Sequence, residues 1–261
     1  MAGLLERIER AQRRRRLERK LLYGCVAALI LIAALAAVYF FAPGTGSDVA
    51  VVRVEGEILT GDFSNGAYVG SEYVGRKVRE AADDPLVKAI VLRIDSPGGS
   101  PAAAQEIVRD LEYARERKTV VTSMGDLAAS AAYLIAAHTD RIYLSPDTMT
   151  GSIGVIWLFT DESEWMKNEG REVEVVKSGE QKDMTSPYRP LTDSERAYAQ
   201  EIVDASFEDF INDVIAQRPV ERSEIASARL IRGEEAIAIG LADEVGNLFD
   251  AIRGARALAS S

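Results

Sequence analysis

The chain has 261 residues, 47% of them hydrophobic, which suits a folded domain with a core and excludes an intrinsically disordered protein. Its single cysteine, Cys25, excludes an intrachain disulfide framework and a Cys/His metal cluster, so we expect no metal site. The net charge of −10 combines an excess of five positive charges over residues 1–20 with an acidic remainder. A basic tail on an acidic domain argues against a nucleic-acid-binding domain.

Residues 21–42 (LLYGCVAALILIAALAAVYFFA) form an apolar run without a single charge. At 1.5 Å per residue the run would span roughly 33 Å as a helix, which matches the hydrocarbon core of a bilayer. We therefore predict one transmembrane helix. Because positive residues stay inside, residues 1–20 are expected to be a cytoplasmic tail and the rest to lie outside. A cleaved signal peptide ending near residues 34–36 and a buried core helix are the alternatives.

Residues 43–48 are a short polar linker, after which apolar strands alternate with helical stretches over residues 49–261. We expect strands at 49–56, 87–95, 119–124, 141–144 and 172–176, and helices at 71–84, 102–117, 128–138, 193–216, 233–239 and 248–258. The last third is mostly helical, and Thr192 with Glu195 forms a capping box that opens its longest helix. This alternation predicts an α/β domain with a mainly parallel sheet and crossover helices.

Two junctions between a strand and a helix carry candidate chemistry. Asp95–Gly99 (DSPGG) has two glycines that let backbone N–H groups turn toward a bound group. Gly125–Tyr133 (GDLAASAAY) places Ser130 among small residues at the start of a helix, where free N–H donors stabilise an oxyanion. The same residues also have purely structural interpretations. The first junction can be a simple turn, and Ser130 can be a helix cap.

A serine nucleophile needs a base. The one histidine, His138, follows Ser130 by eight residues on the same expected helix. That spacing is roughly 12 Å along the axis and argues against a Ser-His-Asp triad. A lysine serves instead when desolvation favours its neutral form. Lys167, Lys177 and Lys182 all follow Ser130, and the residues alone do not choose between them.

Five motifs in this order resemble the signal peptide peptidase A family, in its short form, over about residues 49–250. They are DSPGG at 95–99, MGDLAASAAY at 124–133, TGSIGV at 150–155, KSGEQKDMTSPYRPLT at 177–192 and GLADEVG at 240–246. The resemblance implies a Clp protease and crotonase-like fold of repeated ββα units with a mainly parallel sheet. It also implies peptide hydrolysis by a Ser/Lys dyad without a cofactor.

The same resemblance implies roles for particular residues of this chain. They are Ser130 as nucleophile, Lys182 as general base, Gly98 and Ala131 as oxyanion donors, Ser152 as a residue that orients the lysine, and Gly99 and Lys177 beside them. One departure is that the family usually has two glycines after its nucleophile, where this chain has Ala131 and Ala132. Each alanine keeps the N–H donor and adds a methyl group, which bears on the shape of the pocket.

The expected activity is serine-type endopeptidase activity on remnant signal peptides or other hydrophobic peptides. The expected location is the outer face of the cytoplasmic membrane, with residues 21–42 in the bilayer and residues 49–261 as an extracytoplasmic protease domain. The resemblance further implies a homo-oligomer whose protomers share active sites. Three rivals are a stomatin-processing-type membrane protease of the same fold, a crotonase-like acyl-CoA enzyme and a non-catalytic crotonase-fold scaffold.

Overall fold

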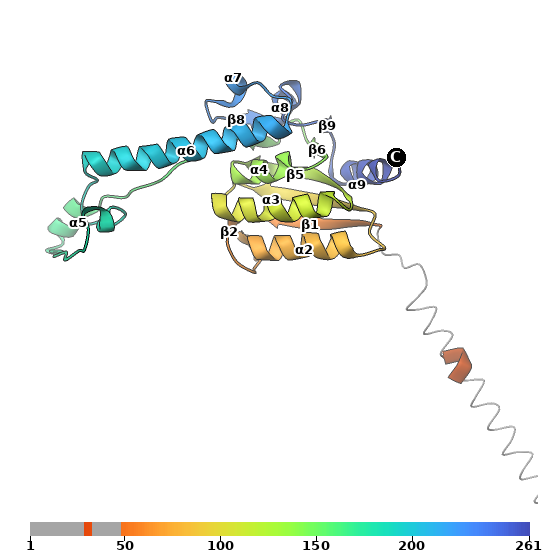
Figure 1. Ribbon diagram of the computed structural model, residues 1–261, viewed down its shortest axis with the longest axis horizontal. Coiled ribbons are helices and arrows are strands. Elements are labelled where there is room, and N and C mark those ends of the chain that lie inside the picture. The colour runs from red at the N-terminus through yellow and green to blue at the C-terminus, as the bar shows by residue number, and fades with distance from the viewer. Residues whose placement is uncertain (1–28, 33–47) are drawn as a thin grey trace, which may run out of the picture. The chain divides into compact units, whose positions relative to one another are not determined.

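Figure 1 shows the computed structural model of the protein, which describes residues 29–32 and 48–261. The predicted tail of residues 1–20, most of the predicted membrane helix of residues 21–42 and nearly all of the linker lie outside the described residues. Residues 29–32 are helical and exposed. In the described part of the chain, no helix combines the length and the apolar character that crossing a membrane requires.

The unit from Asp48 to Ser261 is built of strands and helices that alternate along the chain. Its strands are β1 (Val49–Glu55), β2 (Glu57–Leu59), β3 (Tyr68–Gly70), β4 (Ala89–Ser96), β5 (Thr119–Ala129), β6 (Arg141–Leu144), β7 (Met149–Gly151), β8 (Leu230–Arg232) and β9 (Glu244–Val245). Its helices are α2 (Ser71–Asp83), α3 (Pro101–Arg115), α4 (Ala131–Ala137), α5 (Ser163–Asn168), the 3-10 helix η1 (Glu180–Asp183), α6 (Asp193–Gln217), α7 (Arg222–Ile225), α8 (Gly233–Ala238) and α9 (Leu248–Leu258).

The main sheet has the order β1-β4-β5-β6-β9, and β7 joins it by pairing with both β5 and β8. Every pairing in it is parallel except the antiparallel pair β7–β8, so the predicted mainly parallel α/β architecture is confirmed. Strand β5 is long enough to pair with β6 through residues 121–123 and with β7 through residues 127–129. Its far end thereby carries the chain beyond β6 to the junction with α4.

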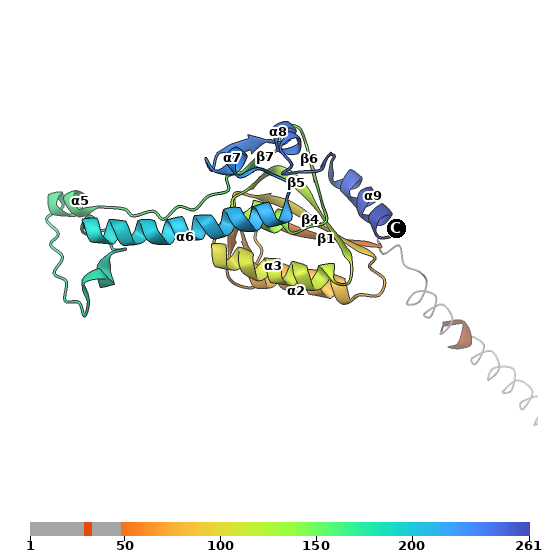
Figure 2. The ribbon, with the colours of Figure 1, turned by 45° about the horizontal axis from the view of Figure 1, so that its top comes forward.

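Strand β4 is buried on both faces, as a central parallel strand should be. Ile90, Leu92 and Ile94 face the larger core, which α2, α3 and α4 complete. Ala89 and Val91 face a smaller core on the other side, completed by α9. Figures 1 and 2 show α2 and α3 together on one side of the sheet and α9 on the other.

Most of the predicted elements are confirmed within a few residues, including β6, α6 with its capping box, and α9. The strand predicted at residues 172–176 is wrong, because this segment is exposed and pairs with no strand. Its alternating valines have the period of a strand, but no strand among residues 48–261 pairs with them. Strand β5 also runs to Ala129, past the predicted end at Met124, and α4 consequently begins later than predicted.

Candidate active site around Ser130

Ser130 lies at the junction between β5 and α4, in a backbone conformation that is rare for a residue with a side chain. Its φ is 56° and its ψ is −126°. The Ser130 N–H donates to the Gly151 carbonyl at 2.8 Å, and the Ser130 carbonyl accepts from the N–H groups of Tyr133 and Leu134. Such strain costs on the order of 1–3 kcal/mol and persists only where the surroundings enforce it. The fold therefore holds Ser130 in a fixed and unfavourable geometry.

The predicted glycine turn packs directly against Ser130. A register shift in the β4–β5 pairing brings Ser96 opposite Ala128, so the turn after β4 reaches the end of β5. Gly98 has a φ of +104°, and a Cβ placed on it would lie 2.8 Å from the Cβ of Ser130. Only glycine can approach the serine this closely. The predicted residues Gly98, Ser130 and Ala131 are thus brought together.

The backbone N–H groups around Ser130 differ in whether they already donate a hydrogen bond. The Gly98 N–H donates to Ser96 Oγ at 3.1 Å. No hydrogen bond of the Gly99 N–H is found within the described chain, and Gly99 is exposed to the cavity beside Ser130. The Ala131 N–H begins α4, where the first amides lack helical partners. Gly99 and Ala131 therefore offer the unoccupied donors of this site.

A cavity of about 240 Å³ opens beside Ser130. Its lining residues come from the glycine turn, α3, α4, the segment after β7 and the C-terminal half of α6. They are Gly99, Pro101, Gln105, Ser130, Ala131, Leu134, Gly154, Val155, Ile156, Ser206, Asp209, Phe210 and Asp213. Ala131 contributes to this lining, whereas Ala132 is fully buried in the core. Of the two alanines that depart from the family pattern, only Ala131 shapes the cavity.

Ser152 directly follows β7, just as Ser130 directly follows β5. Ala129 pairs with Gly151, so each serine follows a paired residue on neighbouring parallel strands. Ser152 also has a positive φ, of 48°, and its N–H donates to the Arg229 carbonyl. The structure therefore brings the predicted residue Ser152 beside the Ser130 junction.

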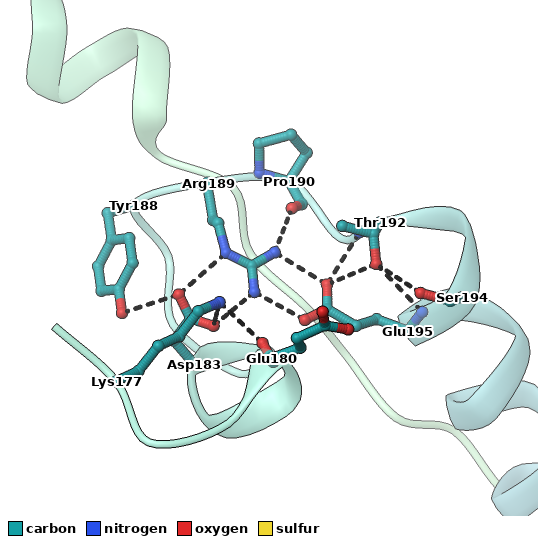
Figure 3. A network of polar contacts seen from close by, with 9 residues as sticks. All are labelled: Lys177, Glu180, Asp183, Tyr188, Arg189, Pro190, Thr192, Ser194 and Glu195. Carbon is teal, nitrogen blue, oxygen red and sulfur yellow. Dashed lines mark hydrogen bonds and ion pairs between the residues drawn. The ribbon is translucent and has the colours of Figure 1, made fainter. Parts of the chain in front are cut away.

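Lys177 belongs to a network of charged side chains at the N-terminal end of α6, shown in Figure 3. Its Nζ lies 2.7 Å from Asp183 Oδ1 and 2.7 Å from the Glu180 carbonyl oxygen. Arg189 bridges Asp183 and Glu195, with its Nη2 at 2.6 Å and 2.7 Å from the two carboxylates. Both carboxylates are buried, so the network fixes η1 against the start of α6.

The hydrogen bonds from Arg189 and then from Lys177 hold the pKa of Asp183 well below its usual range. The hydrogen bonds from Arg189, followed by that from the Thr192 N–H, lower the pKa of Glu195 from 4.5 to about 2. Both carboxylates are therefore ionised at neutral pH, and Lys177 serves as one of their counter-ions.

Lys182 lies on η1, next to Asp183, and is exposed. No partner of its ammonium group is found among residues 48–261. Its neighbour Asp183 is tied through Arg189 to Glu195 in the first turn of α6, whereas the cavity beside Ser130 contacts α6 at residues 206–213. From Glu195 to Ser206 is about 16 Å along a helix. Figure 1 likewise shows α5 and the start of α6 far from α4. One chain does not bring Lys182 to Ser130.

His138 interacts with Asp213 and not with Ser130. It caps the C-terminal end of α4, only 4% exposed, with its Nε2 3.0 Å from Asp213 Oδ1 on α6. No hydrogen bond joins Ser130 Oγ to any described residue. In the part of the chain that the structure describes, no group of three metal-ligating side chains lies together. The sequence did not single out Asp209 or Asp213, which belong to no motif, and it gave no role to Arg189, which lies within the motif at 177–192.

Acyl transfer through a serine requires a fixed hydroxyl, amide donors for the oxyanion and a base. The surroundings of Ser130 supply the first two, an arrangement typical of serine hydrolases on an α/β scaffold. Residues 112–261 match the model of peptidase family S49. The chain belongs to this family, the signal peptide peptidase A family that its motifs resemble.

Three relatives illustrate the similarity. Protease 4 of Salmonella typhi is 35% identical over 219 residues, which are 82% of this chain and 35% of the relative. A protein of Methanocaldococcus jannaschii named as a protease is 34% identical over 180 residues, covering 68% of this chain and 58% of the relative. A protein of Enterococcus faecium named as a signal peptide peptidase is 31% identical over 67% of this chain and 52% of its own length. The chain thus spans between about a third and three fifths of the length of these relatives.

Proposed function

We propose that this protein is a membrane-anchored serine endopeptidase that cleaves peptides with Ser130 as nucleophile and Lys182 as general base. The observation that carries the proposal is the strained Ser130, held at the end of β5 beside free amides and a side-chain cavity. Membership of peptidase family S49 supports the same activity. The stomatin-processing type of membrane protease, the rival with the same chemistry, would differ in its substrate.

In the proposed reaction, neutral Lys182 Nζ takes the proton of Ser130 Oγ, and Oγ forms a bond to the scissile carbonyl carbon. The N–H groups of Ala131 and Gly99 hold the oxyanion, and Gly98 joins them if its bond to Ser96 opens. The protonated lysine then gives its proton to the leaving amine as the C–N bond breaks. Water, deprotonated by Lys182, then attacks the acyl carbon, the bond from that carbon to Oγ breaks, and the protonated lysine returns its proton to Ser130 Oγ.

In this proposal, the Lys182 that serves as the base for one Ser130 belongs to a second copy of the chain. Lys182 is held at the far end of α6 from the cavity, and Ser130 Oγ lacks a partner among the described residues. A lysine acts as a base only as the neutral amine, a form that desolvation favours. A neighbouring protomer packed over the exposed Lys182 would supply both the contact with Ser130 and the desolvation.

The substrate class follows from the expected membrane anchor of residues 21–42. An anchored, outward-facing peptidase meets peptides at the membrane surface, such as remnant signal peptides. The exposed apolar side chains after β7, among them Ile156 and Leu158, support a site for extended apolar chains or for another protomer. No cofactor is needed for this chemistry.

The test is hydrolysis of a fluorogenic peptide by the full chain in detergent, compared with Ser130→Ala. A fluorophosphonate probe that labels the protein but not Ser130→Ala would establish the nucleophile. Peptide hydrolysis that persists in Ser130→Ala would refute the proposal. A protein that neither cleaves peptides nor reacts with the probe would instead be a scaffold with this fold.

A further inference from the structure

The cavity beside Ser130 has an acidic wall that the proposed reaction does not use. Ser206, Asp209, Phe210 and Asp213 of α6 line it. Their spacing of three, four and seven residues places them along one face of the helix. Other carboxylates of α6, such as Asp204 and Glu208, lie outside the cavity. The helix thus turns two of its carboxylates toward the space next to the nucleophile.

The remaining wall of the cavity is largely apolar. Leu134 of α4, Val155 and Ile156 after β7, and Phe210 of α6 contribute hydrocarbon surface. No lysine or arginine is among the lining residues, so nothing in the cavity balances its two carboxylates with a permanent positive charge. An apolar channel that meets carboxylates suits a side chain with an aliphatic stem and a cationic tip.

The two carboxylates differ in their own contacts. Asp213 Oδ1 is 3.0 Å from Nε2 of the buried His138, which fixes the direction of this side chain. Asp209 is exposed, and no hydrogen bond or ion pair of its side chain is found within residues 48–261. Asp213 is therefore a positioned carboxylate, and Asp209 is one that still lacks a counter-ion.

We propose that this cavity binds a lysine or arginine side chain of the substrate, at the residue whose carbonyl Ser130 attacks. The inference rests on the proposed function, because it names the side chain that the peptidase selects. A volume of about 240 Å³ is below the range of roughly 300–1,000 Å³ typical of small-molecule pockets, so it suits a single side chain. Leu134 and Phe210 contact the stem, and Asp209 with Asp213 binds the cationic end.

Selectivity arises because each competing side chain leaves something unsatisfied. A leucine or methionine fills the apolar part and leaves Asp209 without a counter-ion. A glutamate brings a third negative charge into the same space and is repelled. A lysine or arginine satisfies both walls, and the bidentate guanidinium of arginine matches a carboxylate best.

The experiment measures kcat/KM of the full chain in detergent for peptides that differ only in the residue before the scissile bond: arginine, lysine, methionine or glutamate. We expect the two cationic peptides to exceed the methionine peptide by about tenfold and the glutamate peptide by more. Asp209→Asn and Asp213→Asn should each reduce the ratio of arginine to methionine. Asp209→Lys should shift the preference toward glutamate.

Asp204→Asn is the matched control, because it removes one carboxylate from the same helix outside the cavity. If it lowers the arginine-to-methionine ratio as much as Asp209→Asn does, general charge explains the effect and the inference is wrong. A wild-type enzyme that cleaves methionine peptides as well as cationic ones also overturns the inference, while the proposed peptidase stands. If no peptide is cleaved and no probe labels Ser130, the proposed function fails, and the inference fails with it.

Discussion

The Nζ of Lys177 lies 2.7 Å from Oδ1 of the buried Asp183, so this lysine is already engaged as a counter-ion. Lys182, five residues further along, is exposed and free of such a bond in the described chain. The residues alone left Lys167, Lys177 and Lys182 open as the base, and these contacts distinguish an engaged Lys177 from an unengaged Lys182. Lys177 stabilises the segment, while Lys182 is the lysine that a neighbouring molecule can reach.

Substituting each lysine should therefore give opposite results. Lys182→Met should lower kcat/KM by about 10²–10⁴-fold, the contribution of a general base, and leave the Tm unchanged because the side chain is exposed. Lys177→Met should lower the Tm, since Asp183 stays buried with one counter-ion fewer. Peptide hydrolysis and thermal melts of both variants check this. A loss of activity in Lys177→Met at full stability would reverse the assignment.

The network around Arg189 should make stability fall at acidic pH. The pKa of Glu195 is lowered from 4.5 to about 2, and that of Asp183 is lowered too. A depressed pKa stabilises the folded state above the unfolded pKa, and this stabilisation is lost as the pH falls through the folded value. The free energy of unfolding should thus decrease between about pH 5 and pH 2.

Arg189→Met removes the largest cause of both lowered pKa values, so the stability of this variant should depend less on pH in this window. Arg232→Met is the control, because its ion pairs with Asp147 and Glu234 lie at the surface. Urea denaturation of the three proteins at several pH values measures the slopes. Equal slopes for wild type and Arg189→Met would contradict the account.

The backbone strain at Ser130 gives a prediction that is independent of chemistry. Glycine tolerates a φ of 56°, whereas alanine meets the same penalty as serine. Ser130→Gly and Ser130→Ala should both lack activity, but the glycine variant should be more stable than the alanine variant by about 1 kcal/mol. Urea denaturation of the two variants compares them directly. Alanine as stable as glycine would mean that Ser130 is unstrained.

The approach of Gly98 to Ser130 should leave no room for a methyl group. A Cβ on Gly98 would lie 2.8 Å from the Ala129 carbonyl oxygen and from Ser130 Cβ. Gly98→Ala should therefore displace the serine and abolish activity. Gly66→Ala is the matched control, since Gly66 also has a positive φ but no atom within 4 Å of the new Cβ. Activity in Gly98→Ala comparable to that of the control would show that the contact is unimportant.

The sequence predicted the α/β sheet well because buried parallel strands such as β4 are continuous runs of apolar residues. It failed for residues 172–176, where the valines alternate as in a strand but pair with no strand in the described part of the chain. Periodicity reports which side chains could be buried together and does not report whether a neighbouring strand exists.

The candidate site was predictable only where local motifs mark it. The glycine turn and Ser130 stand at strand-to-helix junctions that the sequence reveals. The bond between His138 and Asp213 joins residues 75 positions apart. The approach of Asp209 to the Ser130 cavity likewise depends on how α6 packs against α4, which no local pattern encodes. The separation of Lys182 from Ser130 also became visible only in the fold.

That separation leads to the decisive prediction about assembly. Ser130→Ala and Lys182→Met should each be inactive alone, yet activity should return when the two are co-expressed, because one protomer supplies the serine and its neighbour the lysine. Random mixing in a closed ring leaves about a quarter of the sites with both residues, so about a quarter of wild-type kcat is expected. The blank is the activity of the double variant Ser130→Ala, Lys182→Met expressed alone. If both residues act within one chain, the mixture stays as inactive as the blank, and the shared site must be abandoned.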